Sequence, residues 1–238
     1  MSRRSANGKP TLSKDAVVEA ALDIAHRNGV AKVTIRKLAD TLDVSPMAIY
    51  WHVENKDELF EAMGDRVCRD FVLANDPAAP WHEQLRTIYT DLLDVLTRYP
   101  GAAAIVVPRM LYSENGRAMT ETSLALMRSA GFDVREATQL ARHGTRVVIG
   151  LVVEPLFTDT TIEAVRRAQI LDGYEKMLKT LPHDKYPHIV ESAAVIAKVE
   201  DREEFNSLGI DTYINGLIAL AEKKAISDRA ATPRFGRP

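Results

Sequence analysis

The sequence predicts an all-α protein, and three observations support this fold class. Hydrophobic residues make up 46% of the 238 residues and aromatic residues only 6%, a mixture that favours packed helices over a β-sandwich. Apolar residues recur at the three- and four-residue spacing of a helix face through most of the chain. No segment shows the alternating pattern of a half-buried strand. A chain of this length builds one or two domains.

The N-terminal part is predicted to form four helices, and three of them have a recognisable start or end. Asn28-Gly29 ends the first helix in the usual C-terminal manner. Ser45 fits the N-cap of the third helix, and Pro46 fits its first position, where a missing N–H costs nothing. Asn55 and Glu58 form a capping-box-like pair at the start of the fourth helix. The predicted ranges are 13–28, 34–42, 46–52 and 55–72.

The rest of the chain is also predicted to be helical. We expect helices over 81–98, 101–107, 115–130, 134–157, 161–180, 186–198 and 203–225. The Pro-containing break at 75–80 places a domain boundary near the end of the fourth helix. We therefore expect a disordered basic arm over 1–12, one domain over 13–73, a second over 74–226 and a disordered tail over 227–238.

Positive charge is concentrated near the N-terminus, although the formal net charge of the chain is −2. Four basic residues precede the first acidic residue, and four more lie between Asp23 and Asp40. Local positive charge at one end of a near-neutral chain is typical of a small nucleic-acid-binding module. Arg3 and Arg4 either contact DNA or belong to a solvated tail.

The remaining composition suggests a cytoplasmic protein. No apolar run reaches the length of a membrane span, and the polar, basic N-terminus is not a secretory signal. The single cysteine, Cys68, excludes an internal disulfide and suits a reducing compartment. We expect Cys68 to be a buried, inert thiol, with a nucleophile or redox sensor as the alternative.

Residues from Thr34 to Trp51 have the parts of a helix-turn-helix: a support helix, a tight turn and a recognition helix. Adjacent helical residues point about 100° apart, so Tyr50, Trp51 and His52 cannot all enter one core. Half-buried packing is the structural alternative for these three side chains. Exposed aromatic residues beside Arg36 and Lys56 instead favour contact with phosphates. The predicted outer face comprises Arg36, Pro46, Met47, Ala48, Tyr50, Trp51, His52 and Lys56.

This segment resembles the TetR family of bacterial one-component repressors. The resemblance covers about residues 13–65 and rests on Thr34, Arg36, Leu38-Ala39, Val44-Ser45, Tyr50 and Lys56. The run Tyr50-Trp51-His52-Val53 is similar to the tetracycline-repressor branch in particular. Asp43 stands where the family usually has Gly, but Asp tolerates a left-handed turn better than most residues. Ala130-Gly131-Phe132, Gly150 and Glu154 are similar in order to that branch's inducer-binding domain.

The resemblance implies a homodimer that represses transcription from a palindromic operator and is released by a small-molecule inducer. Arg36 is expected to read a guanine, because its fork matches O6 and N7. Pro46, Met47 and Ala48 suit a thymine methyl group, and Trp51 is expected to pack on the sugar-phosphate wall. The expected phosphate contacts are Thr34, Ser45, Tyr50, His52 and Lys56.

The second domain is expected to provide the dimer interface and the ligand pocket. Helices 134–157 and 203–225 are apolar on two sides, which favours a dimer over a buried central helix in a monomeric bundle. Polar candidates for the pocket are Ser123, His143, Arg146 and Glu154, and apolar candidates are Tyr89, Leu92, Met110, Met127 and Phe157; each has a purely structural alternative. Arg146 falls where the tetracycline-repressor branch has a histidine, and a cation at this position disfavours a bound metal. We therefore expect no metal, no other cofactor and no specificity for tetracycline.

Two other classes of function are less well supported. An enzyme is disfavoured because the sequence contains no nucleophile elbow, no glycine-rich phosphate loop and no paired histidines at metal spacing. A helical protein-interaction module would not need Arg36, Tyr50, His52 and Lys56 around one turn. We therefore expect a regulator that binds double-stranded DNA rather than a catalyst.

Overall fold

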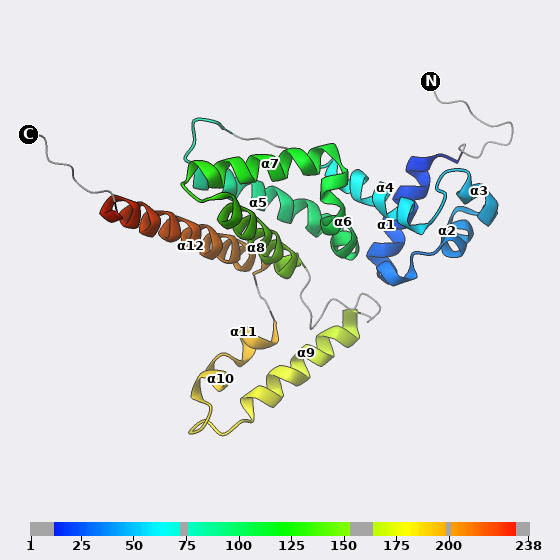
Figure 1. The fold of residues 1–238 in the computed structure, drawn as a ribbon. Helices are drawn as coiled ribbons and strands as arrows, with labels where there is room; N and C mark the ends of the chain where they lie inside the picture. Colours follow the sequence, from blue (N-terminus) through cyan, green and yellow to red (C-terminus); the bar gives the residue numbers. More distant parts are fainter. Residues whose placement is uncertain (1–11, 72–75, 153–163, 199–200, 232–238) are drawn as a thin grey trace, which may run out of the picture.

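The computed structural model describes residues 12–71, 76–152, 164–198 and 201–231 (Figure 1). Within these ranges the chain forms twelve α-helices, three short 3₁₀ helices and no strand, which confirms the all-α class. The α-helices are α1 (Lys14–Asn28), α2 (Ile35–Leu42), α3 (Pro46–Tyr50), α4 (Lys56–Cys68), α5 (Trp81–Arg98), α6 (Ala103–Arg109), α7 (Glu114–Ser129), α8 (Val134–Val152), α9 (Ala164–Lys179), α10 (Pro187–Glu191), α11 (Ala193–Ala197) and α12 (Arg202–Ala231). The 3₁₀ helices are η1 (Val30–Lys32), η2 (Pro100–Ala102) and η3 (Met110–Tyr112).

Side-chain caps set the starts of the first four helices. The side-chain oxygens of Ser13, Thr34, Ser45 and Asn55 each accept a hydrogen bond from the backbone N–H three residues later, at 3.1, 3.1, 3.2 and 2.9 Å. Each bond satisfies an N–H that the helix itself leaves without a partner. The caps expected at Ser45 and Asn55 are therefore confirmed, and these local signals explain why the helix starts were predictable.

The turn between α2 and α3 contains Asp43 in the left-handed region, with φ of 54°. The N–H of Val44 donates to the carbonyl oxygen of Ala39 at 3.0 Å, which closes the end of α2. Asp43 is the one non-glycine residue with positive φ in the described part of the chain. The turn thus forms although Asp43 replaces the glycine that is usual in the family the sequence resembles. This outcome was expected, because Asp tolerates the left-handed conformation.

The second half of the structure is a bundle in which α5, α7, α8 and α12 lie alongside one another (Figure 1). Leu85 and Leu92 of α5, Met127 of α7 and Ile214 of α12 are fully buried in its core. At the start of α5, the ring of Trp81 meets that of Phe132 edge-on, with 6.5 Å between centroids. Helices α9, α10 and α11 pack against each other to one side of this bundle (Figure 1).

Two places join the N-terminal helices to the bundle. Helix α4 packs along α6, and η2 packs against the end of α1. The second contact is so close that a Cβ on Gly101 would lie 2.0 Å from the carbonyl oxygen of Ala25. The orientation of the N-terminal helices therefore depends on both α6 and η2.

Several predicted boundaries were wrong. The helix expected over 186–198 is two short helices, because the backbone leaves helical geometry at Ser192, with ψ of 3°. The disordered tail does not begin at 227, since α12 continues to Ala231. No proline interrupts that Ala- and Lys-rich stretch before Pro233. The helix expected over 101–107 is α6, flanked by η2 and η3. The expected helical segments 153–157 and 161–163 lie outside the described residues.

A glycine allows α8 to approach α5 and α12. A Cβ on Gly144 would lie 2.4 Å from Cζ of Tyr89 and 2.8 Å from Cε1 of Tyr213. The two tyrosine rings meet edge-on with their centroids 5.5 Å apart, and the Tyr213 hydroxyl donates to the carbonyl oxygen of Leu140 at 2.5 Å. Because Tyr89 is only 3% exposed, its ring has little room to move away from an added methyl group.

Gly144→Ala is therefore expected to destabilise the protein by about 1–3 kcal/mol through overpacking. The measurement is the midpoint of urea denaturation at fixed protein concentration. Gly173→Ala is the matched control, because a Cβ on Gly173 of α9 meets nothing within 4 Å. Equal midpoints for the two variants would contradict the tight α5–α8–α12 packing.

Candidate nucleic-acid interface

The outer face of α2 and α3 carries unusually large exposed apolar side chains. Met47 is 66% exposed, Tyr50 46% and Trp51 84%, whereas Ile49 between them is fully buried. His52 is partly buried. Ile49 thus anchors α3 to the core, and its neighbours face outwards. Pro46 is exposed and Ala48 partly buried on the same short helix.

Donor groups surround this apolar face. Arg36 and Lys56 are exposed, and neither forms an ion pair with an acidic residue in the described ranges. Thr34 and Ser45 are exposed N-caps whose oxygens already accept a backbone N–H. Each hydroxyl therefore retains its own O–H to donate to an external acceptor. The structure thus brings all ten predicted contact residues to α2, α3 and the first turn of α4.

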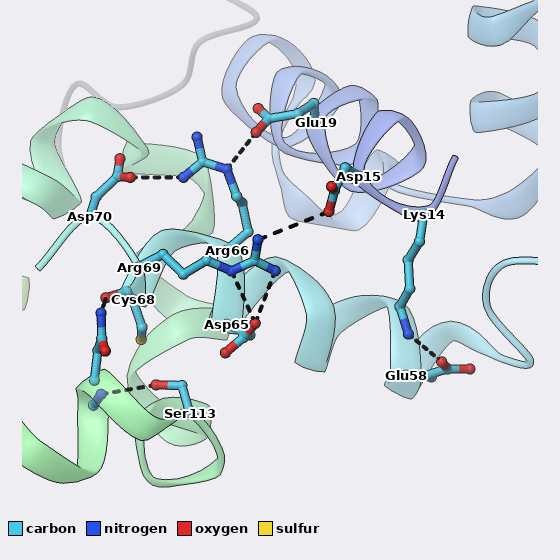
Figure 2. Close-up of polar contacts among 12 residues, drawn as sticks. Lys14, Asp15, Glu19, Glu58, Asp65, Arg66, Cys68, Arg69, Asp70 and Ser113 are labelled. Atoms are coloured by element: carbon cyan, nitrogen blue, oxygen red, sulfur yellow. Dashed lines mark hydrogen bonds and ion pairs between the residues drawn. The ribbon is translucent and has the colours of Figure 1, made fainter. Parts of the chain in front are cut away.

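Glu58 organises the corner between α3 and α4. Its Oε2 accepts the N–H of Glu54 at 2.6 Å, while its own N–H donates to Oδ1 of Asn55 at 2.9 Å. Its Oε1 accepts a hydrogen bond from Nζ of Lys14 in α1 at 2.6 Å (Figure 2). The bond from Lys14, followed by the Glu54 N–H, lowers the pKa of the Glu58 carboxyl. These bonds fix the backbone on either side of Lys56 at the start of α4.

Further ion pairs join α1 to α4 (Figure 2). Arg66 contacts Glu19 of α1 at 2.5 Å and Asp70 at 2.8 Å. Arg69 contacts Asp65 at 3.1 Å and reaches Asp15 of α1 at 4.0 Å. With the Lys14–Glu58 pair, these contacts run along most of α4. They join α1 to α4 in addition to the packing between the two helices.

Five of the candidate pocket residues lie in the core between neighbouring elements. They belong to α5, η3 and α7, and α7 packs against both of the other elements. Their relative exposures are at most 5%, and they are Tyr89, Leu92, Met110, Ser123 and Met127. The Ser123 hydroxyl donates to the carbonyl oxygen of Met119 at 2.9 Å. The Tyr89 hydroxyl is buried without a hydrogen bond of regular geometry.

The other candidate pocket residues lie elsewhere. His143 and Arg146 are exposed on α8. His143 lines a groove of about 480 Å³ between α8 and α12, together with Leu140 and Leu220 among others. Glu154 and Phe157 lie outside the described residues. The structure therefore buries five of the candidates on neighbouring elements and sets His143 and Arg146 on the outer side of α8.

The comparisons with known proteins decide the family. The sequence pattern described as bacterial regulatory proteins, tetR family, matches residues 17–63. The pattern of the tetracyclin repressor-like C-terminal domain matches residues 74–221, more than half of the chain. The chain belongs to the TetR family. It is accordingly a DNA-binding transcriptional regulator.

Individual relatives agree with this assignment. An HTH-type transcriptional regulator of Saccharopolyspora erythraea is 32% identical over 60% of this chain and 61% of its own length. The TetR family protein ActR of Streptomyces coelicolor, solved with actinorhodin, is 26% identical, with a TM-score of 0.70 over 88% of this chain and 98% of ActR. BioQ, solved with its DNA operator, is 25% identical, with a TM-score of 0.57 over 88% of this chain and 99% of BioQ.

Sequence reasoning missed several residues that shape this TetR-family chain. Gly144 and Tyr213 surround Tyr89, and Arg109 of α6 reaches the first turns of α4. For the contact of Gly144 and Tyr213 with Tyr89, the only signal in the sequence was a glycine inside an apolar helix. Cys68 is fully buried, as expected, and this burial raises the pKa of its thiol, which suits an inert residue.

Two kinds of feature are absent from the ranges that the structure describes. No helix there is long and apolar enough to cross a membrane. No cluster of three or more histidine, cysteine or acidic side chains there is arranged to hold a metal ion.

The lowered pKa of Glu58 predicts an acid-dependent contribution to stability. A group whose pKa is lowered by folding stabilises the folded state above its ordinary value, here 4.5, and this contribution is lost as the pH falls through the folded pKa. We expect Glu58→Gln to lower the thermal midpoint at neutral pH and to converge with the unsubstituted protein at lower pH. Thermal unfolding followed by circular dichroism across this pH range measures the difference.

Glu61→Gln is the matched control, because Glu61 is an exposed carboxylate on the same helix. The thermal midpoint of Glu61→Gln is expected to differ from that of the unsubstituted protein by the same amount at every pH. If the difference for Glu58→Gln is also the same at every pH, the Lys14–Glu58 contact adds no pH-dependent stability.

Proposed function

We propose that the chain is a cytoplasmic repressor without catalytic activity that binds a palindromic operator as a homodimer and is released by a small-molecule inducer. The observation that carries this proposal is the exposed face of α2, α3 and the start of α4, where apolar side chains are surrounded by donors. A DNA-reading domain over residues 13–73 and a ligand and dimer domain over 74–226 complete the proposal. Its first test is a mobility-shift titration against the DNA upstream of its own gene.

The proposed contacts divide into base readers and phosphate anchors. Arg36 reads guanine, because its guanidinium is exposed on α2 without an acidic partner in the described chain. Pro46, Met47 and Ala48 contact thymine methyl groups. Trp51 packs on the sugar-phosphate wall. The anchors are Thr34, Ser45, Tyr50, His52 and Lys56, all of which carry donors.

The proposed dimer uses the outer faces of α8 and α12. In α12, Ile210, Ile214 and Leu217 are buried against the chain's own bundle, yet Leu208 is 65% exposed and Leu220 48%. A helix that is apolar on two faces requires two partners. A twofold arrangement would place the two copies of α3 about 34 Å apart, one turn of DNA.

The proposed inducer site lies inside the second domain. Its proposed interior lining is the buried set Tyr89, Leu92, Met110, Ser123 and Met127. Of the other proposed ligand residues, His143 and Arg146 lie exposed on the outer side of α8, and Glu154 and Phe157 lie outside the described residues. Two observations support this interior: it is largely apolar, and the buried Tyr89 hydroxyl lacks a regular hydrogen bond. ActR, which was solved with actinorhodin, is similar over most of its length. The cation of Arg146 favours a neutral or anionic ligand without a metal.

Arg36→Ala is expected to cost about 1–3 kcal/mol of operator binding and to relax selectivity at one base pair of each half-site. The measurement is a panel of mobility-shift titrations against the operator and its single-base variants. Arg27→Ala is the control, because Arg27 is an exposed cation on α1, paired with Asp23 at 2.8 Å. If Arg36→Ala keeps the base preferences of the unsubstituted protein, the assigned role of Arg36 is wrong.

The exposed apolar face of α3 predicts that thymine methyl groups contribute to recognition. Replacing the contacted thymine by deoxyuridine removes one methyl group and should weaken binding by about fourfold, as expected for roughly 0.8 kcal/mol per buried carbon. In Met47→Ala the same replacement should have almost no effect, since the contact is already lost. Deoxyuridine placed outside the half-sites is the control. An equal loss in both proteins would exclude Met47 as the methyl-contacting residue.

A further inference from the structure

Helices α4 and α6 meet most closely at Gly64. A Cβ on this residue would lie 3.4 Å from Cβ of Arg109 and 4.0 Å from Cα of Val106. Gly64 is buried and has no side chain beyond its backbone, so α6 passes close to the backbone of α4 here. Arg109 is the last residue of α6, and its neighbour Met110 is 5% exposed in the core of the second domain.

The side chain of Arg109 reaches towards the first turns of α4. Its guanidinium carbon lies 5.6 Å from the centroid of the Phe60 ring, and its Nη2 lies 3.8 Å from Oδ1 of Asp57. Nζ of Lys56 lies 5.1 Å from the centroid of the same ring. One aromatic ring therefore holds two cations, one from the reading domain and one from the second domain.

This shared ring restricts the lysine that is proposed to bind a phosphate. Lys56 is the first residue of α4, where the positive end of the helix dipole also favours an anion. A lysine held over a ring explores fewer rotamers than a free one, and less entropy is lost when it binds. Arg109, which belongs to the second domain, limits the movement of the Phe60 ring through its own contact with it. If the ring shifts, Lys56 loses its cation–π contact.

We propose that Arg109 is a positioning residue for the contact between Lys56 and the operator phosphate. The inference rests on the proposed role of Lys56 and adds a residue of the second domain to it. Arg109 acts through Phe60 and Asp57 and does not itself contact DNA. Operator affinity therefore depends on the position of α6 through one defined side chain.

The test is a double-mutant cycle in operator binding between Arg109→Ala and Lys56→Ala, measured by mobility shift at several salt concentrations. Arg109→Ala should weaken binding by roughly fivefold to thirtyfold, as expected for one exposed cation–π contact in each of two subunits. In the Lys56→Ala background it should change affinity by less than about twofold. The salt slope of both single variants should fall by up to about two per dimer, because each subunit loses one phosphate contact.

Controls separate positioning from general damage. Arg109→Lys retains a cation for the ring and should recover most of the affinity, whereas Phe60→Leu retains apolar bulk and should reproduce the loss. Arg166→Ala removes an exposed cation from α9, which belongs to none of the proposed contact surfaces, and should leave binding unchanged. Thermal unfolding verifies that each variant is folded, and if Arg109→Ala is not, Phe60→Leu takes its place in the cycle.

Two results would overturn the proposal. Additive losses in the cycle would mean that Arg109 contacts DNA or acts independently of Lys56, and an unchanged affinity in Arg109→Ala and Phe60→Leu would mean that the ring does not support Lys56. Failure of the unsubstituted protein to bind any operator is a different outcome, because it would contradict the proposed function itself.

Discussion

Helix α4 is buried on two sides, and the rest of the structure depends on this double burial. Leu59, Met63 and Val67 are fully buried. One side of the helix packs on α1, and the other packs on α6 and η3. A rigid helix shared by two cores cannot move relative to one without disturbing the other. Any ligand that prefers one position of α6 therefore changes the energy of the reading domain, which is the requirement for coupling between two sites.

The charges around α4 are arranged to support this role. Three acidic residues of α1 and α4 are paired with cations, Glu58 with Lys14, Glu19 with Arg66 and Asp65 with Arg69 (Figure 2). These pairs partly offset the negative charge beside the reading surface, which is the exposed face of α2 and α3 proposed to contact DNA. Arg36 and Lys56 remain exposed and face outwards. Although the chain has a formal net charge of −2, neither of these two cations forms an ion pair within the described ranges. The cations proposed to bind phosphates are therefore different from those in the ion pairs between α1 and α4.

Short-range signals made the reading domain predictable, whereas long-range packing made the second domain harder to predict. The caps at Ser45 and Asn55 and the turn at Asp43 depend on residues within a few positions of each other, so the sequence shows them directly. The Tyr89–Gly144–Tyr213 contact joins three helices, and no local pattern indicates it. The break at Ser192 and the continuation of α12 to Ala231 are also hard to predict. The helix propensities of the residues there differ too little to show where a helix ends.

The exposure of Trp51 makes intrinsic fluorescence a useful way to follow this protein in solution. The chain contains only two tryptophans, and they lie in different domains. Trp51 is 84% exposed on the reading surface, while Trp81 is partly buried at the start of α5 against Phe132. Indole emission responds to the polarity around the ring, so each domain carries its own intrinsic fluorophore. Single-tryptophan variants would report operator docking and changes in the second domain separately, without any attached label.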